Sequence, residues 1–169
     1  MVAGLDGSLA GVRLGVPRAY FFDAPDLNPE IRDAVLTAID QLASAGAAIV
    51  DVVIPHAALA RVANTVISRS EAYAYHEPDL QSRPELYGKY IRQSLRQGAF
   101  YTAADYIQAQ RVRALIKAEC AQALTDVDLP IIPTSINTAP KFEGHNPDAM
   151  LTPVRYGEPA IIFPATTAR

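Results

Sequence analysis

The stretch of residues 12–54 constrains the fold most, because it has the pattern of a strand, a helix and a second strand in close succession. Residues 12–16 alternate in polarity and stop at Pro17, as a strand would. Residues 48–54 form a run rich in β-branched residues that ends at Pro55. A strand–helix–strand unit of this length favours two parallel strands joined by a right-handed crossover.

The helix inside this unit carries both a start signal and a stop signal. Asn28, Pro29 and Glu30 have the residue types of an N-cap, a first-turn proline and an acidic first turn. Gly46 is the residue type that commonly follows the end of a helix. Between these signals, apolar residues recur at spacings of four, three and four, which predicts one buried helix face: Ile31, Val35, Ala38 and Leu42.

The middle of the chain is predicted to be helical. An apolar face runs from Leu59 to Tyr73, and its pattern stops before Pro78. Ser82 and Glu85 have the spacing of a capping box, which would begin the next helix. We therefore expect one helix to end before the proline and another to start just after it.

The last third of the chain begins with a further helix. Thr102 can cap it, with Asp105 at the third helical position. Its apolar stripe is Ala109, Val112, Ile116 and Ala123. Strands are predicted at residues 128–134 and 159–164, and the segment 137–157 between them is predicted to be a loop because it is rich in Pro, Gly, Asn and Asp.

This order of elements predicts an α/β fold in which a partial mixed sheet is flanked by helices. We expect residues 1–169 to form a single domain, since no segment has the composition of an inter-domain linker. Pro130 and Pro133 lie inside a predicted strand and cannot donate to a neighbouring strand. That strand is therefore expected at an edge, or to be irregular.

Composition and charge exclude several classes of function. The net charge of −3 gives no basis for binding nucleic acid or an anionic membrane surface. No apolar run approaches the ~20 residues needed to cross a bilayer, and no signal peptide opens the sequence. Cys120 is the single cysteine, so an internal disulfide framework is excluded. Its side chain is expected to be buried. A cytoplasmic location is the expectation.

Metal and nucleophile motifs are also lacking. His56, His76 and His145 show no metal-ligand spacing, so we expect no metal and no cofactor. Ser68 and Ser70 near His76 could suggest a serine–histidine pair. Neither serine stands in the G-x-S-x-G context of a nucleophile elbow, so that reading is set aside.

Several short motifs together resemble the C-terminal half of the amidase signature family. Each motif is weak alone, but their number, order and spacing are similar to those of the family. They are residues 9–21 ("L-x-G-x-R-I-G-V-P"), 43–50 ("L-x-x-x-G-A-x-V"), 70–76 ("x-E-A-x-x-x-H"), 102–113 ("D-Y-x-x-A-x-x-x-R"), 128–134 ("D-x-L-x-x-P-T") and 157–164 ("G-x-P-A-x-x-x-P"). The resemblance implies that the chain is a fragment of the amidase-signature fold.

Members of this family hydrolyse amides with a serine nucleophile, a second serine in a cis peptide and a lysine, which lie in a Gly/Ser-rich run. The sequence contains no Gly-Gly and no Ser-Ser pair, and its lysines, Lys89, Lys117 and Lys141, stand outside the family's lysine context. No catalytic residue can therefore be assigned. We expect the chain to be truncated at both ends, with the nucleophile-bearing core upstream of it.

The resemblance implies that the intact enzyme acts on a small amide without a cofactor or metal. In such an enzyme, Glu71, Tyr75 and His76 are candidates for the wall of the substrate pocket. Whether the chain alone is an enzyme is left open. The alternative is a non-catalytic interaction or oligomerisation module that forms a homo-oligomer or docks on the missing core, because a piece of a larger sheet exposes edges and apolar surface.

Overall fold

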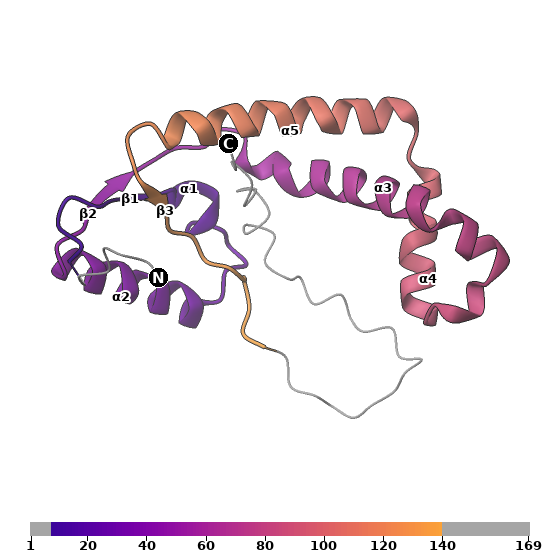
Figure 1. Cartoon of the computed structure of the whole chain (residues 1–169). Helices are drawn as coiled ribbons and strands as arrows, with labels where there is room; N and C mark the ends of the chain where they lie inside the picture. Colours follow the sequence, from indigo (N-terminus) through magenta and orange to yellow (C-terminus); the bar gives the residue numbers. More distant parts are fainter. Residues whose placement is uncertain (1–7, 140–169) are drawn as a thin grey trace, which may run out of the picture. The chain divides into compact units, whose positions relative to one another are not determined.

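The computed structural model describes residues 8–139 and divides the chain into two compact units (Figure 1). Of the described residues, unit 1 contains 8–58 and 116–139, and unit 2 contains 59–115. The strand expected at residues 159–164 and most of the loop expected at 137–157 lie outside the described residues.

Unit 1 is built around a parallel three-stranded sheet with the order β2-β1-β3. Strand β1 (Arg13–Val16) pairs with β2 (Ala48–Asp51) and with β3 (Leu129–Pro130), in both cases in parallel. Leu14 lies opposite Ile49 on one side and opposite Leu129 on the other. The α/β fold class and the parallel strand–helix–strand unit are thus confirmed, and β3 is a short edge strand in the described part of the chain.

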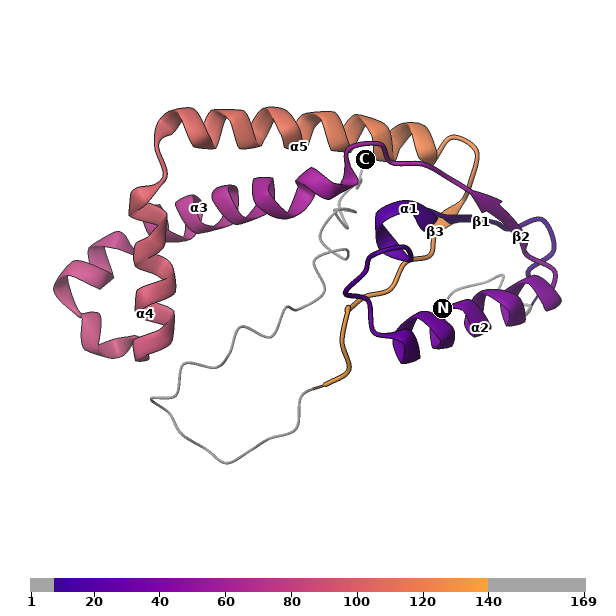
Figure 2. The same cartoon turned by 180° about the vertical axis from the view of Figure 1, so that it is seen from behind.

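Helix α2 (Pro29–Ser44) connects β1 to β2 and runs alongside the sheet (Figure 2). Its predicted cap forms, because the Asn28 side chain accepts a hydrogen bond from the Glu30 N–H at 2.9 Å. The helix ends two residues before Gly46, whose φ of 105° is a backbone conformation that glycine adopts without strain. The start and the end of this helix are therefore confirmed.

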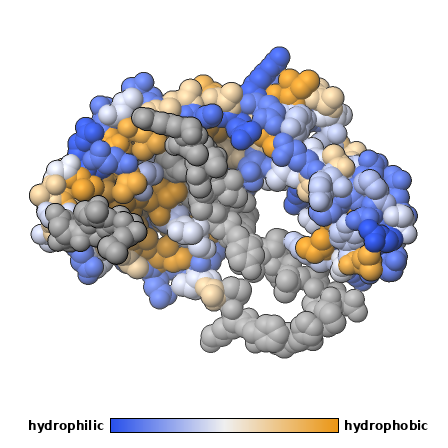
Figure 3. Space-filling model, in the orientation of Figure 1, coloured by the Kyte–Doolittle hydropathy of each residue, from blue (hydrophilic) through white to orange (hydrophobic). Residues whose placement is uncertain are grey.

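The core of unit 1 lies between the sheet, α2 and the end of helix α5 (Ala103–Ala123). The helix contributes Ile116 and the expected buried Cys120. The short segment α1 (Arg18–Phe21) follows β1 and buries Phe21, and its backbone leaves the helical conformation at Ala19 and Tyr20. The other apolar residues of unit 1 that are almost fully covered are Leu14, Val16, Phe22, Leu27, Ile39, Ala47, Ile54, Ala57, Val127 and Ile136. Hydrophobic residues are also visible on the surface of this unit (Figure 3).

Unit 2 is helical. Helix α3 (Ala60–Ser82) follows a short 3-10 turn, η1 (Ala57–Leu59), and runs antiparallel to the first part of α5 (Figure 1). Between them the chain forms η2 (Pro84–Leu86), α4 (Lys89–Arg96) and η3 (Gln97–Phe100). The α3–α5 core consists of Ala63, Ile67 and Ala109, with Val66, Tyr106 and Val112 packed against it.

Two predictions about helix ends in unit 2 are wrong. Helix α3 does not stop before Pro78 but continues through it to Ser82. Ser82 does not cap the next helix, since its hydroxyl donates to the Pro78 carbonyl at 2.7 Å. The proline removes one backbone donor, but the terminal turn keeps the hydrogen bond from the Arg83 N–H to the Asp79 carbonyl at 2.8 Å, and the side chains of Arg83 and Asp79 add an ion pair.

The capping box predicted for α5 is confirmed. The Thr102 N–H and hydroxyl both donate to the Asp105 carboxylate, at 2.9 and 2.7 Å, and the Asp105 N–H donates back to the Thr102 hydroxyl at 3.1 Å. The pKa of Asp105 is lowered, first by the hydrogen bond from the Thr102 hydroxyl and then by that from its backbone N–H.

Over residues 8–139, no helix is both long and apolar enough to cross a membrane.

Candidate functional site

The three pocket candidates lie on α3, but the structure does not bring them to one point. The Glu71 carboxylate accepts a hydrogen bond from the Tyr106 hydroxyl of α5 at 2.8 Å. Tyr75 is 82% exposed and lies edge-on against the neighbouring ring of His76, with ring centroids 4.8 Å apart. His76 makes its hydrogen bond to Tyr87, which follows η2. Glu71 thus serves the α3–α5 contact, whereas Tyr75 and His76 form an aromatic surface near the end of α3.

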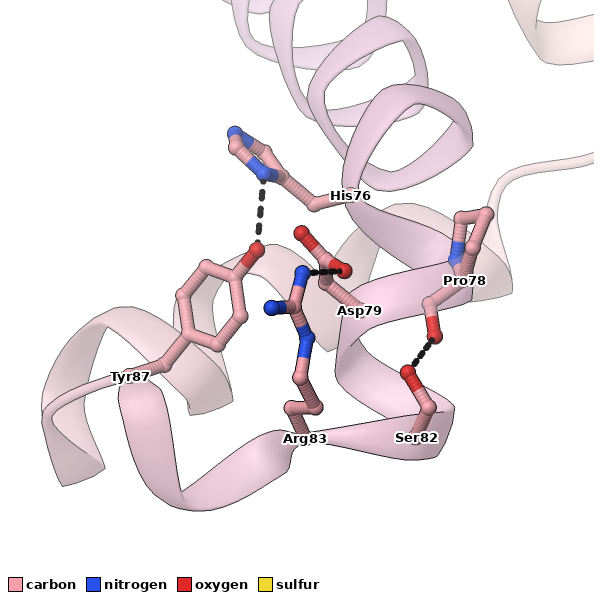
Figure 4. A network of polar contacts seen from close by, with 6 residues as sticks. All are labelled: His76, Pro78, Asp79, Ser82, Arg83 and Tyr87. Carbon is pink, nitrogen blue, oxygen red and sulfur yellow. Dashed lines mark hydrogen bonds and ion pairs between the residues drawn. The ribbon is translucent and has the colours of Figure 1, made fainter.

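A polar network at the end of α3 surrounds His76 (Figure 4). The His76 Nδ1 atom lies 3.0 Å from the Tyr87 hydroxyl, and the two rings meet edge-on with centroids 5.6 Å apart. One turn further along the helix, the Arg83 guanidinium donates to the Asp79 carboxylate at 2.6 Å. The network fastens the turn that follows α3 to the helix itself.

The surroundings of this network shift the pKa of two groups. The hydrogen bond from the Arg83 guanidinium lowers the pKa of Asp79, and the nearby His76 and Tyr87 lower it further. Partial burial, followed by the negative charge of Asp79, raises the pKa of Tyr87. At neutral pH, therefore, Asp79 is an ionised acceptor and Tyr87 is a neutral phenol that can donate or accept.

A second polar series links α3 to α5. The Gln110 amide donates to the Tyr106 hydroxyl at 2.8 Å, and that hydroxyl donates to Glu71 at 2.8 Å. The Arg113 guanidinium donates to the Gln110 carbonyl oxygen at 3.4 Å. The Glu71 carboxylate is exposed, and its hydrogen bond to Tyr106 links α3 to α5.

An apolar groove of about 390 Å³ lies between α3 and α5 within unit 2. Its lining residues are Leu59, Val62, Ala63, Val66, Tyr101, Asp105, Gln108, Ala109 and Val112. Val62 is 63% exposed at its edge. The groove has the lining chemistry of a surface that packs against another apolar group, and none of the three pocket candidates lines it.

The described histidines have partners other than a metal ion. His56 of unit 1 donates its backbone N–H to the Glu119 carboxylate of α5 at 3.0 Å, and its ring contacts the same carboxylate. Burial is the largest single influence on the pKa of Glu119 and raises it, but the hydrogen bonds and charge of His56 outweigh burial, so the pKa is lowered. Within residues 8–139, no group of three or more potential ligands could hold a metal ion. His145 lies outside that range.

Sequence reasoning missed Asp79, Arg83 and Tyr87 as neighbours of His76. The spacing of four residues between Asp79 and Arg83 on a helix is the one local signal that could have found part of the network. No local signal could have found Tyr87, because it reaches His76 only when the chain turns back after α3.

The chain matches the family model described as Amidase over residues 1–168. A curated protein named Amidase from Pseudomonas putida is 44% identical over 131 residues, which covers 78% of this chain and 28% of that protein. A glutamyl-tRNA(Gln) amidotransferase chain of Pseudomonas fluorescens is 33% identical over 170 residues, which covers 86% of this chain and 35% of that one. The chain thus spans about a third of the length of these relatives.

The chain is also similar in structure to solved proteins. A crystal structure of an amidase matches with a TM-score of 0.71 and 27% identity, covering 81% of this chain and 31% of that one. A structure described as a vestigial protein complex that reveals the origins of an s-triazine catabolic enzyme matches with a TM-score of 0.73 and 25% identity, over 92% of this chain and 34% of that one.

Proposed function

Because the chain belongs to the amidase family, we propose that the protein in which it works hydrolyses the carbon–nitrogen bond of amides through a serine acyl-enzyme. The observation that carries this proposal is the family match over residues 1–168. In the reaction, a serine oxygen attacks the amide carbonyl, the amine or ammonia leaves with a proton, and water then hydrolyses the acyl ester to an acid. The reaction takes place in the cytoplasm and uses no cofactor.

In this proposal the chain supplies strands and helices at the periphery of the catalytic domain, together with part of the pocket wall. The Gly/Ser-rich core that carries the nucleophile lies elsewhere, since the sequence contains no Gly-Gly or Ser-Ser pair. Tyr75 and His76 contribute to the wall, which is supported by the 82% exposure of Tyr75 and by its edge-on packing against His76. Glu71 contributes indirectly, because its carboxylate accepts the hydrogen bond from Tyr106 that links α3 to α5.

Ammonia release and covalent labelling test the proposal. The full-length protein is expected to release ammonia from simple amides and to be labelled by a fluorophosphonate, which reacts with activated serines. The 169-residue chain by itself is expected to do neither. A full-length protein that releases no ammonia from any amide and takes up no label refutes the proposed chemistry, and activity of the purified chain alone refutes the assignment of the nucleophile to another segment.

Two substitutions test the pocket wall. In the full-length protein, Tyr75→Ala and His76→Gln are expected to raise KM for the amide, with little change in thermal stability for Tyr75→Ala and a small loss for His76→Gln, which gives up the contact with Tyr87. Glu71→Gln is the matched control, because it weakens the α3–α5 contact and should lower stability before it alters KM. If all three variants change only stability, Tyr75 and His76 have no role in the pocket.

The partner of this chain is proposed to be the catalytic core of an amidase domain, on the same polypeptide or on another. The open apolar groove of unit 2 supports this proposal, because an apolar face of this kind is normally covered. Mixing the 169-residue chain with the separately expressed upstream part of the Pseudomonas putida relative should give a 1:1 complex by size exclusion with light scattering. A homo-oligomer of the chain that does not bind this core contradicts the proposal.

A further inference from the structure

The turn that follows α3 returns to the helix through the side chain of Tyr87. Its hydroxyl lies 3.0 Å from the His76 Nδ1 atom, and the two rings meet edge-on. The same hydroxyl approaches the Asp79 carboxylate closely enough to form a hydrogen bond with it. Figure 4 shows one Asp79 oxygen bonded to Arg83 and the other turned toward Tyr87. A single hydroxyl thus faces both a ring nitrogen and a carboxylate.

The direction of these hydrogen bonds follows from the number of hydrogens available. Asp79 is a carboxylate at neutral pH, because the hydrogen bond from Arg83 lowers its pKa, and a carboxylate can only accept. The Tyr87 hydroxyl has one hydrogen, which a charged acceptor binds more strongly than a neutral ring nitrogen does. The hydroxyl therefore donates to Asp79, and its oxygen is left to accept from the His76 ring. The Nδ1 atom of His76 must then carry a hydrogen.

This arrangement responds differently to the protonation of its two ends. The Nδ1 atom of His76 keeps its hydrogen whether the ring is neutral or protonated, so protonation of the ring leaves the contact with Tyr87 intact. Protonation of Asp79, in contrast, removes the charged acceptor of the Tyr87 hydroxyl. If Nδ1 instead accepted from Tyr87, protonation of the ring would break the contact.

The neighbouring titratable groups leave this arrangement to Asp79. Of the groups that shift the pKa of Tyr87, Asp79 is the one carboxylate. A tyrosine ordinarily ionises at about pH 10, so a neighbouring phenol adds no charge below neutral pH. The neighbours are Glu77, whose carboxylate binds Tyr73 and Gln81; Glu85, near Arg83; Tyr75, near Tyr87; and Arg92 of α4, whose guanidinium donates to the Pro84 carbonyl.

We propose that His76, Tyr87 and Asp79 form an acid-sensitive latch, which holds the turn of residues 83–88 against α3 and opens when Asp79 is protonated. The latch stays closed through the pH range in which histidines ordinarily titrate. Because the hydrogen bond from Arg83 lowers the pKa of Asp79, the latch is fully closed above the ordinary Asp pKa and opens as the pH falls through the lowered value. Opening separates Tyr87 from His76 and leaves the α3–α5 core in place.

The position of the hydrogen on the His76 ring is the first test. Long-range proton–nitrogen spectra of the 169-residue chain, labelled with ¹⁵N at histidine, should show the neutral ring at pH 8 with its hydrogen on Nδ1, the less common position in a free side chain. His76→Gln assigns the signal. Tyr87→Phe should move the hydrogen to Nε2, whereas Tyr90→Phe, on an exposed tyrosine of α4, is the matched control and should not. A hydrogen on Nε2 in the parent, or no change in Tyr87→Phe, overturns the proposal.

The second test follows the nuclear Overhauser effect between the rings of His76 and Tyr87 as the pH falls. The effect should persist from pH 8 to pH 5 and disappear below the ordinary Asp pKa, while the effects within the α3–α5 core remain. Its disappearance between pH 8 and pH 5 would mean that Nδ1 accepts from Tyr87, and would overturn the proposal.

Asp79→Ala separates the latch from general unfolding in acid, because it removes the acceptor at neutral pH. The Tyr87 hydroxyl is then free to donate to the His76 ring, so the hydrogen of the neutral ring should move to Nε2. The contact between the rings should then disappear between pH 8 and pH 5. Glu85→Ala, which removes the other carboxylate near Arg83, is the matched control and should behave as the parent. An Asp79→Ala variant that keeps the hydrogen on Nδ1 overturns the proposal, even if the parent unfolds in acid.

Discussion

Gly98 allows η3 to lie directly against α3, and replacing it with alanine tests how close that packing is. A Cβ atom on Gly98 would lie 2.2 Å from the Arg69 carbonyl oxygen and 2.5 Å from the Tyr73 Cβ. Neither atom can rotate away, because one belongs to the backbone of α3 and the other is the first atom of its side chain. The backbone of η3 or of α3 must therefore move to accept the methyl group.

The expected loss of stability follows from two opposing effects. Forcing extra atoms into a packed site costs about 3 kcal/mol at the upper end of the usual range. Replacing glycine by alanine restricts the unfolded chain, which offsets up to about 1 kcal/mol. The net loss is about 2 kcal/mol, which lowers the melting temperature by about 4–8 °C for a chain of this size.

Gly88 provides the matched control. A Cβ atom there would meet nothing within 4 Å, and the φ of −55° suits alanine. Gly88→Ala should therefore change stability by less than about 0.5 kcal/mol, since a weaker N-cap offsets the restricted unfolded chain. Urea unfolding followed by circular dichroism at 222 nm measures both variants, with an unchanged m-value as the check on the comparison. If Gly98→Ala is as stable as Gly88→Ala, the close approach of η3 to α3 is not real.

Three further variants test other contacts. Ser70→Ala should leave stability unchanged or raise it by up to about 1 kcal/mol in urea unfolding, because the buried Ser70 hydroxyl has no hydrogen-bond partner in the described part of the chain; a loss above 1 kcal/mol would reveal a partner. Thr102→Ala should cost about 1 kcal/mol at pH 7 by loss of the cap. Because the pKa of Asp105 is lowered in the folded state, the contribution of its carboxylate to stability is complete above the ordinary Asp pKa and is lost as the pH falls through the lowered pKa. The difference in stability between Thr102→Ala and the parent should therefore narrow in acid. A constant difference from pH 7 to pH 3 contradicts this account. Glu119→Gln should lower stability at neutral pH, because the pKa of Glu119 is also lowered in the folded state, with His56 as its partner. The variant should also lose less stability than the parent as the pH falls. Melting temperatures that match the parent at both pH 7 and pH 4 would exclude the contact.

Local signals in the sequence predicted the elements they govern. Asn28 and Gly46 marked the two ends of α2, and Thr102 with Asp105 marked the start of α5, because a cap involves only residues within a few positions of one another. The parallel pairing of β1 with β2 followed from the short helical connection. The end of α3 was predicted wrongly at Pro78, since a proline weakens a helix without always ending it.

Contacts between distant segments were beyond such reasoning. The chain position of Tyr106 does not predict its hydrogen bond to Glu71, which depends on how α3 and α5 pack. The same holds for Tyr87 and His76, which meet after the chain reverses direction. The positive φ of Tyr20 gave no signal at all, because tyrosine does not favour this conformation.

The proline inside α3 divides the helix into parts with different tolerance for sequence change. Before Pro78, Ala63 and Ile67 pack in the α3–α5 core, so their size and shape are constrained. After Pro78, the last turn contains the buried Leu80, but its end is held by an exposed pair, Asp79 with Arg83, which other residues of suitable charge can reproduce. Over evolutionary time, insertions and substitutions in the turn that follows α3 should therefore accumulate faster than in the body of the helix. This would let the family reshape one end of unit 2 while the helix pair stays the same.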